Sequence, residues 1–185
     1  SFKMGCTNYN CTDILPQVLN TCGELVEGGF DQAVIFDCDA TTTDYTNGTE
    51  VAADIAAGRA VIYKNIKSGI DAPSANEIDV MVAGQEPRAV NYSRTATWVD
   101  ANVNTSSSAA YDTLDATSGI TVKAILFHLA SGENTILVDP PKGCIFKGGL
   151  IVPNDVSDAA RYEYTASWKD PNSPSVKAVP SGVFA

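Results

Sequence analysis

Histidine, methionine and long apolar runs are what this chain of 185 residues has least of. Its one histidine, His128, lies in a strand-like run, and there are two methionines. A zinc centre needs closely spaced Cys and His pairs, and a hydrolase triad needs a nucleophile with a positioned base, so we expect neither. No apolar run approaches the ~20 residues of a membrane span, and the start lacks the basic-then-apolar pattern of a signal peptide. We therefore expect no membrane partner.

Basic residues are also few, with 12 Lys and Arg against 22 Asp and Glu, which gives a net charge of −10. A surface of this sign attracts neither nucleic-acid phosphates nor anionic lipids. The sequence has no glycine-rich loop that opens a helix and no basic patch with interleaved aromatic residues. These absences predict no catalytic, no cofactor-binding and no metal-binding residues.

Cysteine is present, but not in the pattern of a disulfide framework or a metal site. The count of five is odd and no CxxC pair occurs. Both features argue against a disulfide-stapled secreted domain, so we expect reduced and partly buried thiols. The five residues are Cys6, Cys11, Cys22, Cys38 and Cys144.

Short apolar and alternating runs dominate the chain and predict strands. Hydrophobic residues make up 44% of the sequence, enough for the core of one domain. Helices are predicted only over 49–57, which Gly58 would end, and over 107–116, which a serine cluster would cap; residues 12–19 are compatible with a third. The predicted strands are 32–37, 60–66, 77–83, 88–102, 121–130, 134–139, 144–152 and 161–170.

Alternation with period two is typical of antiparallel sheets with one buried face. We therefore predict a mainly β fold, an antiparallel two-sheet sandwich or barrel with one short flanking α-helix. The β domain is expected over 31–170. An N-terminal arm would occupy 1–30, and a proline-rich C-terminal arm, with apolar residues near its end, would occupy 171–185.

Two stretches echo one another, YSRTATWVD at 92–100 and YEYTASWKD at 162–170. Each places small apolar and aromatic residues on one face and polar residues on the other, which predicts that Trp98 and Trp168 face the core. Arg94 interrupts the apolar face of the first stretch. Either an internal repeat or the general preference of Thr, Tyr and Trp for strands would explain the echo.

The stretch VIFDCDATTT, residues 34–43, presents DxDxT after an apolar strand. It resembles the first motif of the haloacid dehalogenase-like phosphatases, in which Asp37 would be the nucleophile and Asp39 the general acid/base. That chemistry also needs a lysine and a second acidic motif that holds Mg²⁺. The candidates for these roles are Lys142 or Lys147, and Asp155 with Asp158.

The predicted architecture argues against this enzyme. Its parallel strands need crossover helices, whereas the region between Asp39 and Asp155 offers two short helices and several alternating strands. The strand RYEYTASW, where the family has a helix, follows Asp158. We expect Asp37 and Asp39 to lie in a solvated acidic turn and the protein not to be an enzyme.

The order of elements in the second half carries another resemblance. An alternating strand precedes a serine-rich short helix, a long strand, a hairpin after SGENTILV, the turn KGGL, a polar loop and the final strand RYEYTASW. This order resembles the tail tube proteins of long-tailed bacteriophages. The opening, a polar arm with cysteines before Gly28-Gly29 and DQAVIFD, resembles virion proteins of phages that infect Bacteroidetes-type bacteria.

The resemblance implies a virion structural protein, assembled in the host cytoplasm, whose copies join their sheets into hexameric rings. Stacked rings would enclose a channel through which DNA passes without specific binding, and other tail proteins would be partners. Polar strand faces and negative charge suit such a wet channel. The alternatives are a capsid-decorating or head–tail connector protein, and a monomeric β-sandwich module that binds a ligand.

Overall fold

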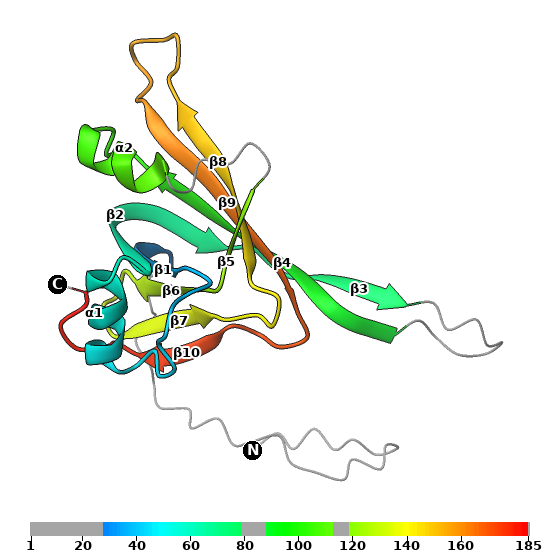
Figure 1. Ribbon diagram of the computed structural model, residues 1–185. Coiled ribbons are helices and arrows are strands. Elements are labelled where there is room, and N and C mark those ends of the chain that lie inside the picture. Colours follow the sequence, from blue (N-terminus) through cyan, green and yellow to red (C-terminus); the bar gives the residue numbers. More distant parts are fainter. Residues whose placement is uncertain (1–27, 79–87, 113–118, 185) are drawn as a thin grey trace, which may run out of the picture.

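A computed structural model describes residues 28–78, 88–112 and 119–184, which form a mainly β structure (Figure 1). The predicted fold class is confirmed at this level. The helices are α1 (Gly48–Ala56) and α2 (Thr105–Asp112). The strands are β1 (Phe30–Phe36), β2 (Ala60–Ile70), β3 (Ser74–Ile78), β4 (Arg88–Asp100), β5 (Ile120–Val122), β6 (Ala124–Leu129), β7 (Asn134–Val138), β8 (Cys144–Ile151), β9 (Arg161–Asp170) and β10 (Ser175–Ala178).

All ten strands of the described residues belong to one sheet, in the order β10-β7-β6-β1-β2-β4-β9-β8-β5, and β3 pairs with β4 beside this path. Each pairing between them is antiparallel. The expected division into two sheets is therefore not found, and the sheet does not close into a barrel. Two helices, rather than one, accompany the sheet in the described residues.

The sheet curls because one short stretch of chain supplies both the strand at one end of the sheet and a strand near the other end. A single residue, Lys123, separates β5, the last strand of the path, from β6, which lies near the other end. The stretch 121–130, predicted as one strand, is thus divided: β5 pairs with β8, while β6 pairs with β1 and β7. The covalent link forces the β8–β5 end to bend back over β6.

An aromatic core fills the space inside the curl. The ring centroids of Trp98 on β4 and Phe127 on β6 lie 6.1 Å apart, although two strands separate β4 from β6 along the sheet. Phe146 on β8 meets Trp98 edge to face at 5.5 Å, and Phe30 stacks on Phe127 at 4.5 Å. One cluster of buried residues therefore joins both halves of the sheet.

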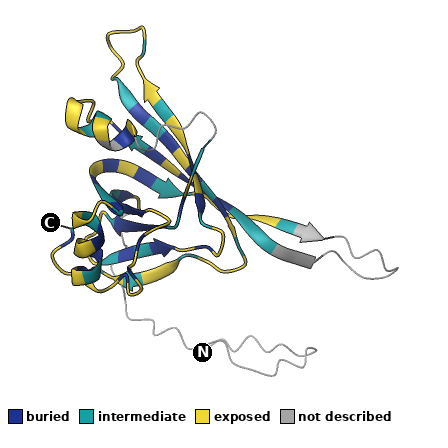
Figure 2. Cartoon of the chain, viewed as in Figure 1, coloured by how far each residue is buried: buried dark blue, intermediate teal, exposed yellow. Residues whose placement is uncertain are grey.

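The two echoing stretches are neighbours in space, because β4 pairs with β9 over their whole length. Trp98 stands opposite Tyr164, and Arg94 stands opposite Trp168. The predicted core positions of both tryptophans are confirmed, with 1% of Trp98 and 5% of Trp168 exposed. The alternation of buried and exposed residues along these strands is visible in Figure 2.

A buried polar chain attaches α2 to this core. The Trp98 indole N–H donates to the Tyr111 hydroxyl at 2.9 Å, and that hydroxyl donates to Asp100 Oδ2 at 2.8 Å. Burial raises the pKa of Tyr111 far above its ordinary value, so the hydroxyl remains a donor. The Tyr111 ring also stacks on Tyr162, with 4.1 Å between centroids. Tyr111 thus ties the short helix to both echoing strands.

The outer face of β1, β6 and β7 carries a second, smaller core. Val34, Phe36 and Leu126 lie beneath Val51 of α1, and Val183 near the C-terminus completes the cluster. Asn47 caps α1, since its side chain accepts from the Thr49 N–H. In Figure 1 the last residues, drawn in red, run alongside α1.

The segment expected to be a C-terminal arm is packed against its own domain. β10 adds a strand to the edge of β7, and Val183 is 7% exposed. The expected N-terminal arm lies outside the described residues up to residue 27, as do the possible helix at 12–19 and residues 79–83 of a predicted strand. Residues 171–184 therefore contribute to the fold rather than project from it.

Replacing either core tryptophan should strongly destabilise the domain. We expect Trp98→Ala and Trp168→Ala each to lower the free energy of unfolding by about 3–5 kcal/mol, because each leaves a large cavity in a packed aromatic layer. Thr97→Ala, on the exposed face of the same strand, is the matched control and should change it by less than about 0.5 kcal/mol. Urea denaturation followed by circular dichroism measures all three. Equal midpoints for the tryptophan variants and the parent would show that the assigned core is wrong.

Candidate functional site

The acidic stretch that raised the phosphatase hypothesis leaves the sheet at the end of β1 and turns sharply. The Asp37 N–H donates to the Arg59 carbonyl at 2.9 Å, and the Ala40 N–H donates to the Asp37 carbonyl at 3.0 Å. Asp37, Cys38 and Asp39 are exposed, and Asp37 Oδ1 accepts from the Cys38 N–H at 2.7 Å. Both aspartates therefore face solvent, as the sequence predicts.

The next residues are held from inside by the carboxylate of Asp54, on α1. Its Oδ2 accepts from the Thr42 hydroxyl at 2.6 Å and the Thr42 N–H at 2.8 Å, and its Oδ1 accepts from the Thr41 hydroxyl at 2.9 Å. Arg59 Nε donates to the same Oδ1 at 2.7 Å. Thr41, the threonine of the DxDxT pattern, is thus committed to a structural bond.

Asp54 is fully buried yet stays ionised. Burial acts to raise its pKa, but the hydrogen bonds from Thr42, Arg59 and Thr41 outweigh burial and hold the pKa well below its ordinary value. A buried carboxylate with this many donors organises the loop between β1 and α1. Asp54 therefore stabilises the fold, and its carboxylate is committed to these hydrogen bonds rather than free to react.

Glu50 repeats the arrangement one helical turn earlier. Its Oε2 accepts from the N–H groups of Thr43 at 2.9 Å and Asp44 at 3.1 Å, and the bond from Thr43 lowers its pKa. Sequence reasoning missed Glu50 and Asp54 as partners of this loop. The available signal was two acidic residues four positions apart, on one helix face, following a run of three threonines.

The second acidic motif lies far from the first. Asp155 and Asp158 belong to the loop that joins β8 to β9, at the tip of a hairpin that projects from the body (Figure 1). Asp155 Oδ1 accepts from the Ser157 N–H at 2.9 Å, which lowers its pKa, and Asp158 pairs with Arg161 at 3.2 Å. The structure therefore does not bring these carboxylates to Asp37.

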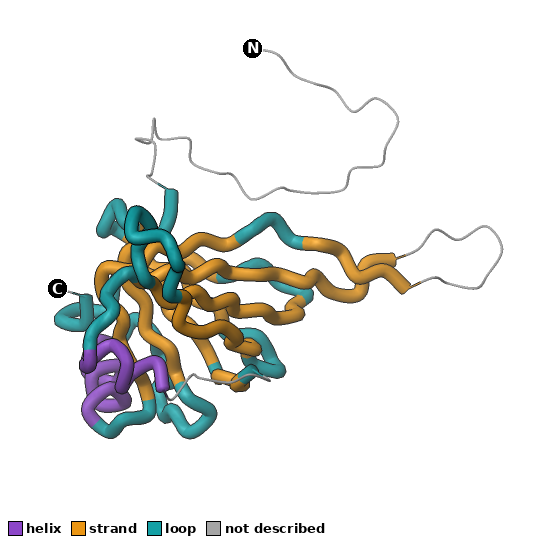
Figure 3. The backbone as a smooth tube through the Cα atoms, turned by 90° about the horizontal axis from the view of Figure 1, so that it is seen from above, coloured by secondary structure: helices purple, strands orange, loops and turns teal. Residues whose placement is uncertain are grey.

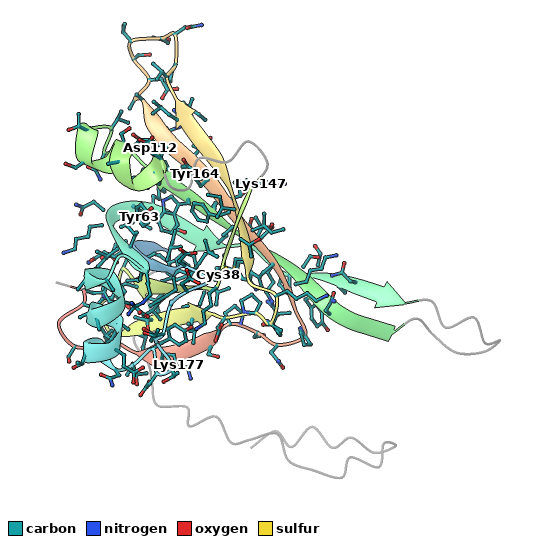
Figure 4. All side chains as sticks on the ribbon, in the orientation of Figure 1. Cys38, Tyr63, Asp112, Lys147, Tyr164 and Lys177 are labelled. Atoms are coloured by element: carbon teal, nitrogen blue, oxygen red, sulfur yellow. The ribbon has the colours of Figure 1, made fainter. Side chains whose placement is uncertain are left out.

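The two candidate lysines are also dispersed. Lys147 lies on β8, above Cys38 in the view of Figure 4. Lys142, from the loop between β7 and β8, lines an open hollow of about 500 Å³ that also includes Cys38 and Lys123. Lys123 Nζ donates to the Ala40 carbonyl at 3.0 Å. Lys123 and Lys142 therefore lie close to the DxDxT loop, but Asp155 and Asp158 do not line this hollow.

Of the histidine and the two cysteines in the described residues, Cys38 is exposed, and His128 and Cys144 are buried. His128 is 8% exposed, its Nδ1 lies 2.7 Å from Asp31 Oδ1, and its ring stacks on Phe184. Cys144 is buried, and burial raises its pKa to about 12. Among the described residues, no group of three or more His, Cys, Asp and Glu could hold a metal ion. Outside that part of the chain lie Cys6, Cys11 and Cys22.

The most unusual surface is apolar and lies on the β8–β9 hairpin. Leu150 is 51% exposed, Val152 68%, and Val156 is fully exposed. We call residues 150–156 the hairpin tip. Beneath it, β8 pairs with β5 only at 144–146, so within the described residues its stretch 147–151 has a strand partner on one side alone.

No family model, curated protein or solved structure matches the chain. Among the described residues, no helix combines the length and the apolar character that crossing a membrane requires. The features of the described residues that bear most directly on function are the edge of β8 over 147–151, which has a strand partner on one side alone, and the apolar hairpin tip.

Removing the buried carboxylate should cost much of the domain's stability. We expect Asp54→Asn to lower the free energy of unfolding by about 3–5 kcal/mol, because Arg59 and the two threonines lose their common acceptor. Asp39→Asn, an exposed neighbour in the same loop, is the control. The pKa of Asp54 is depressed in the folded state, so its contribution is complete above the unfolded pKa of about 4 and is lost as the pH falls below it.

The gap between parent and Asp54→Asn should therefore be widest at neutral pH and shrink below about pH 4. Urea titrations at a series of pH values measure it. A gap that stays constant into acid would contradict the ionised, hydrogen-bonded state assigned to Asp54.

The exposed aspartates should have no catalytic role. We expect no Mg²⁺-dependent hydrolysis of p-nitrophenyl phosphate by the full chain, because the second acidic motif lies on a distant hairpin. Asp37→Asn and the control Asp44→Asn should behave alike in this assay. Hydrolysis by the parent that disappears only in Asp37→Asn would revive the phosphatase hypothesis.

Proposed function

We propose that this protein is a structural subunit that assembles with copies of itself through its sheet, as a tail tube protein of a long-tailed bacteriophage does. The observation that carries the proposal is the edge of β8 over 147–151, which within the described residues has a strand partner on one side alone, together with the apolar hairpin tip. An unpaired strand edge offers backbone N–H and C=O groups to another strand. Exposed apolar side chains beside it add burial at about 25 cal/mol per Å².

The projecting shape supports contacts with neighbours. β3 and the first half of β4 extend beyond the rest of the sheet, and the β8–β9 hairpin projects in another direction (Figures 1 and 3). β3 pairs only with β4 in the described part of the chain. Two projections with open edges give a subunit different surfaces for different neighbours, which is what a ring of head-to-tail contacts requires.

The outer face of β4 and β9 fits the wall of a wet channel. Thr97 stands opposite Thr165, and Thr95 stands opposite Ser167, so a ladder of small hydroxyl side chains crosses both strands. Thr97 and Thr165 are exposed. The same outward register also carries exposed lysines, Lys147 opposite Thr165 and Lys67 opposite Val99, so it is the net charge of −10 of the whole chain that would keep DNA phosphates from adhering. We propose that this face lines the channel and lets DNA pass.

On this proposal the protein is not an enzyme, resides in the virion and has copies of itself and other tail proteins as partners. A capsid-decorating or head–tail connector role uses the same edge but a different symmetry. A monomeric ligand-binding module is the alternative from another class. The size and shape of the assembled particle distinguish these roles.

Electron microscopy and light scattering of the purified full chain test the proposal. We expect rings or tubes at high protein concentration. Leu150→Asp should abolish them, because it places a charge on the hairpin tip, whereas Val103→Asp, an exposed apolar control in another loop, should not.

A chain that remains monomeric at every concentration would refute self-assembly and favour the ligand-binding module. Closed particles of a different symmetry would favour the decorating or connector role over the tail tube.

A further inference from the structure

The C-terminal segment packs against its own domain chiefly through its last residues, whereas the β10 side chains remain largely exposed. Val183 is buried among Val34, Phe36 and Val51, and Phe184 stacks on His128 with 4.8 Å between ring centroids. We call residues 175–184 the tail and the surface that it covers, between α1 and the outer face of β6 and β7, the tail groove.

The tail groove recognises the tail closely at two points. A Cβ atom added to Gly48, at the start of α1, would lie 2.0 Å from the carbonyl oxygen of Ser181, so the backbones approach as only glycine permits. The buried hydroxyl of Thr135 lies 3.2 Å from the Lys177 carbonyl and donates to it. The contacts of Gly48 and Thr135 with the tail are therefore made only when a tail occupies the tail groove.

The connection between the tail and the rest of the chain is largely exposed, and its Asn172 N–H donates to Asp170 Oδ1 at 2.8 Å. Residues 171–174, Pro-Asn-Ser-Pro, join β9 to β10 and can span at most about 14 Å. We call this stretch the hinge. It carries the chain from β9 to β10 at the far end of the sheet path, and its two prolines restrict how it can bend.

Beneath the hinge the packing is incomplete. A hollow of about 210 Å³ lies there, lined by Leu137, Trp168, Ser173 and Lys177 among others. Arg94, only 9% exposed, reaches the Ser173 hydroxyl at 3.4 Å, and its buried Nε has no hydrogen-bond partner in the structure. The Arg94 guanidinium also lies over the Tyr92 ring, 5.7 Å from its centroid, so its single long hydrogen bond to Ser173 contributes little to holding the hinge closed.

A tail that is anchored by its last residues and by the β10–β7 pairing, and that is joined by a short, loosely packed hinge, is the arrangement that favours exchange. The contacts between tail and tail groove are the same whichever copy supplies the tail, so only the hinge decides between the closed and the exchanged form. We propose that the tail is exchanged between copies of this chain, each tail filling the tail groove of a neighbour. The exchange needs only two copies and does not depend on the proposed channel.

Two variants of the full-length chain test the exchange, one with a damaged tail groove and one with a damaged tail. Gly48→Ala damages the tail groove but leaves the tail intact, and Val183→Asp damages the tail but leaves the tail groove intact. Neither variant alone contains a matched pair. A mixture does, if the tail of the first chain can enter the tail groove of the second. Both chains also carry Leu150→Asp, so that assembly through the hairpin tip does not interfere and the two proposals fail or succeed separately.

We expect the mixture, but neither variant alone, to give a one-to-one complex in native mass spectrometry and light scattering. If the two variants remain separate monomers after mixing, the proposal is wrong. If a variant fails to fold, the hinge supplies a second test on the unaltered tail and tail groove. Deleting Asn172 and Ser173 should strengthen dimerisation at least about tenfold, and inserting Gly-Ser-Gly after Asn172 should weaken it. Equal dimerisation by both hinge variants and the parent would also refute exchange.

Discussion

The aromatic packing of Trp98 against both Phe127 and Phe146 is the interaction on which the rest of the structure depends. These residues come from β4, β6 and β8, and they meet only because the sheet curls. The one-residue link at Lys123 enforces that curl, and the burial of large rings stabilises it. The outer face left by the curl then receives α1 and the tail.

Because the sheet curls but does not close, it keeps strand edges at which neighbouring copies could pair. A closed barrel would have used every strand edge, whereas this sheet leaves part of β8 paired on one side in the described residues. The tail groove follows from the same geometry, since it needs a strand edge at β7 to accept β10. The proposed assembly and the proposed exchange therefore use two ends of one open sheet.

The alternation of apolar and polar residues predicted those features of the fold that depend on neighbouring residues alone. Period-two alternation assigned the buried faces of β4 and β9, including the interruption at Arg94, because side-chain direction depends only on neighbouring residues. The break at Lys123 could not be foreseen, because it depends on which strands lie beside each half of that stretch. The same holds for Val183, which packs against Val34, Phe36 and Val51, all more than 100 positions earlier. Asp54 differs, because its threonine partners are only 12 and 13 residues away and the acidic residues of α1 after the threonine run were a usable signal.

The central claim is that copies join through the edge of β8 over 147–151, which is paired on one side within the described residues. Hydrogen exchange across a concentration series tests it most directly. The amides of residues 147–151 that do not bond to β9 should exchange fast in dilute protein and become protected as assembly proceeds. The amides of β6, which pair on both sides, should be protected throughout. Assembly that leaves residues 147–151 exchanging as fast as in the dilute protein would contradict the account.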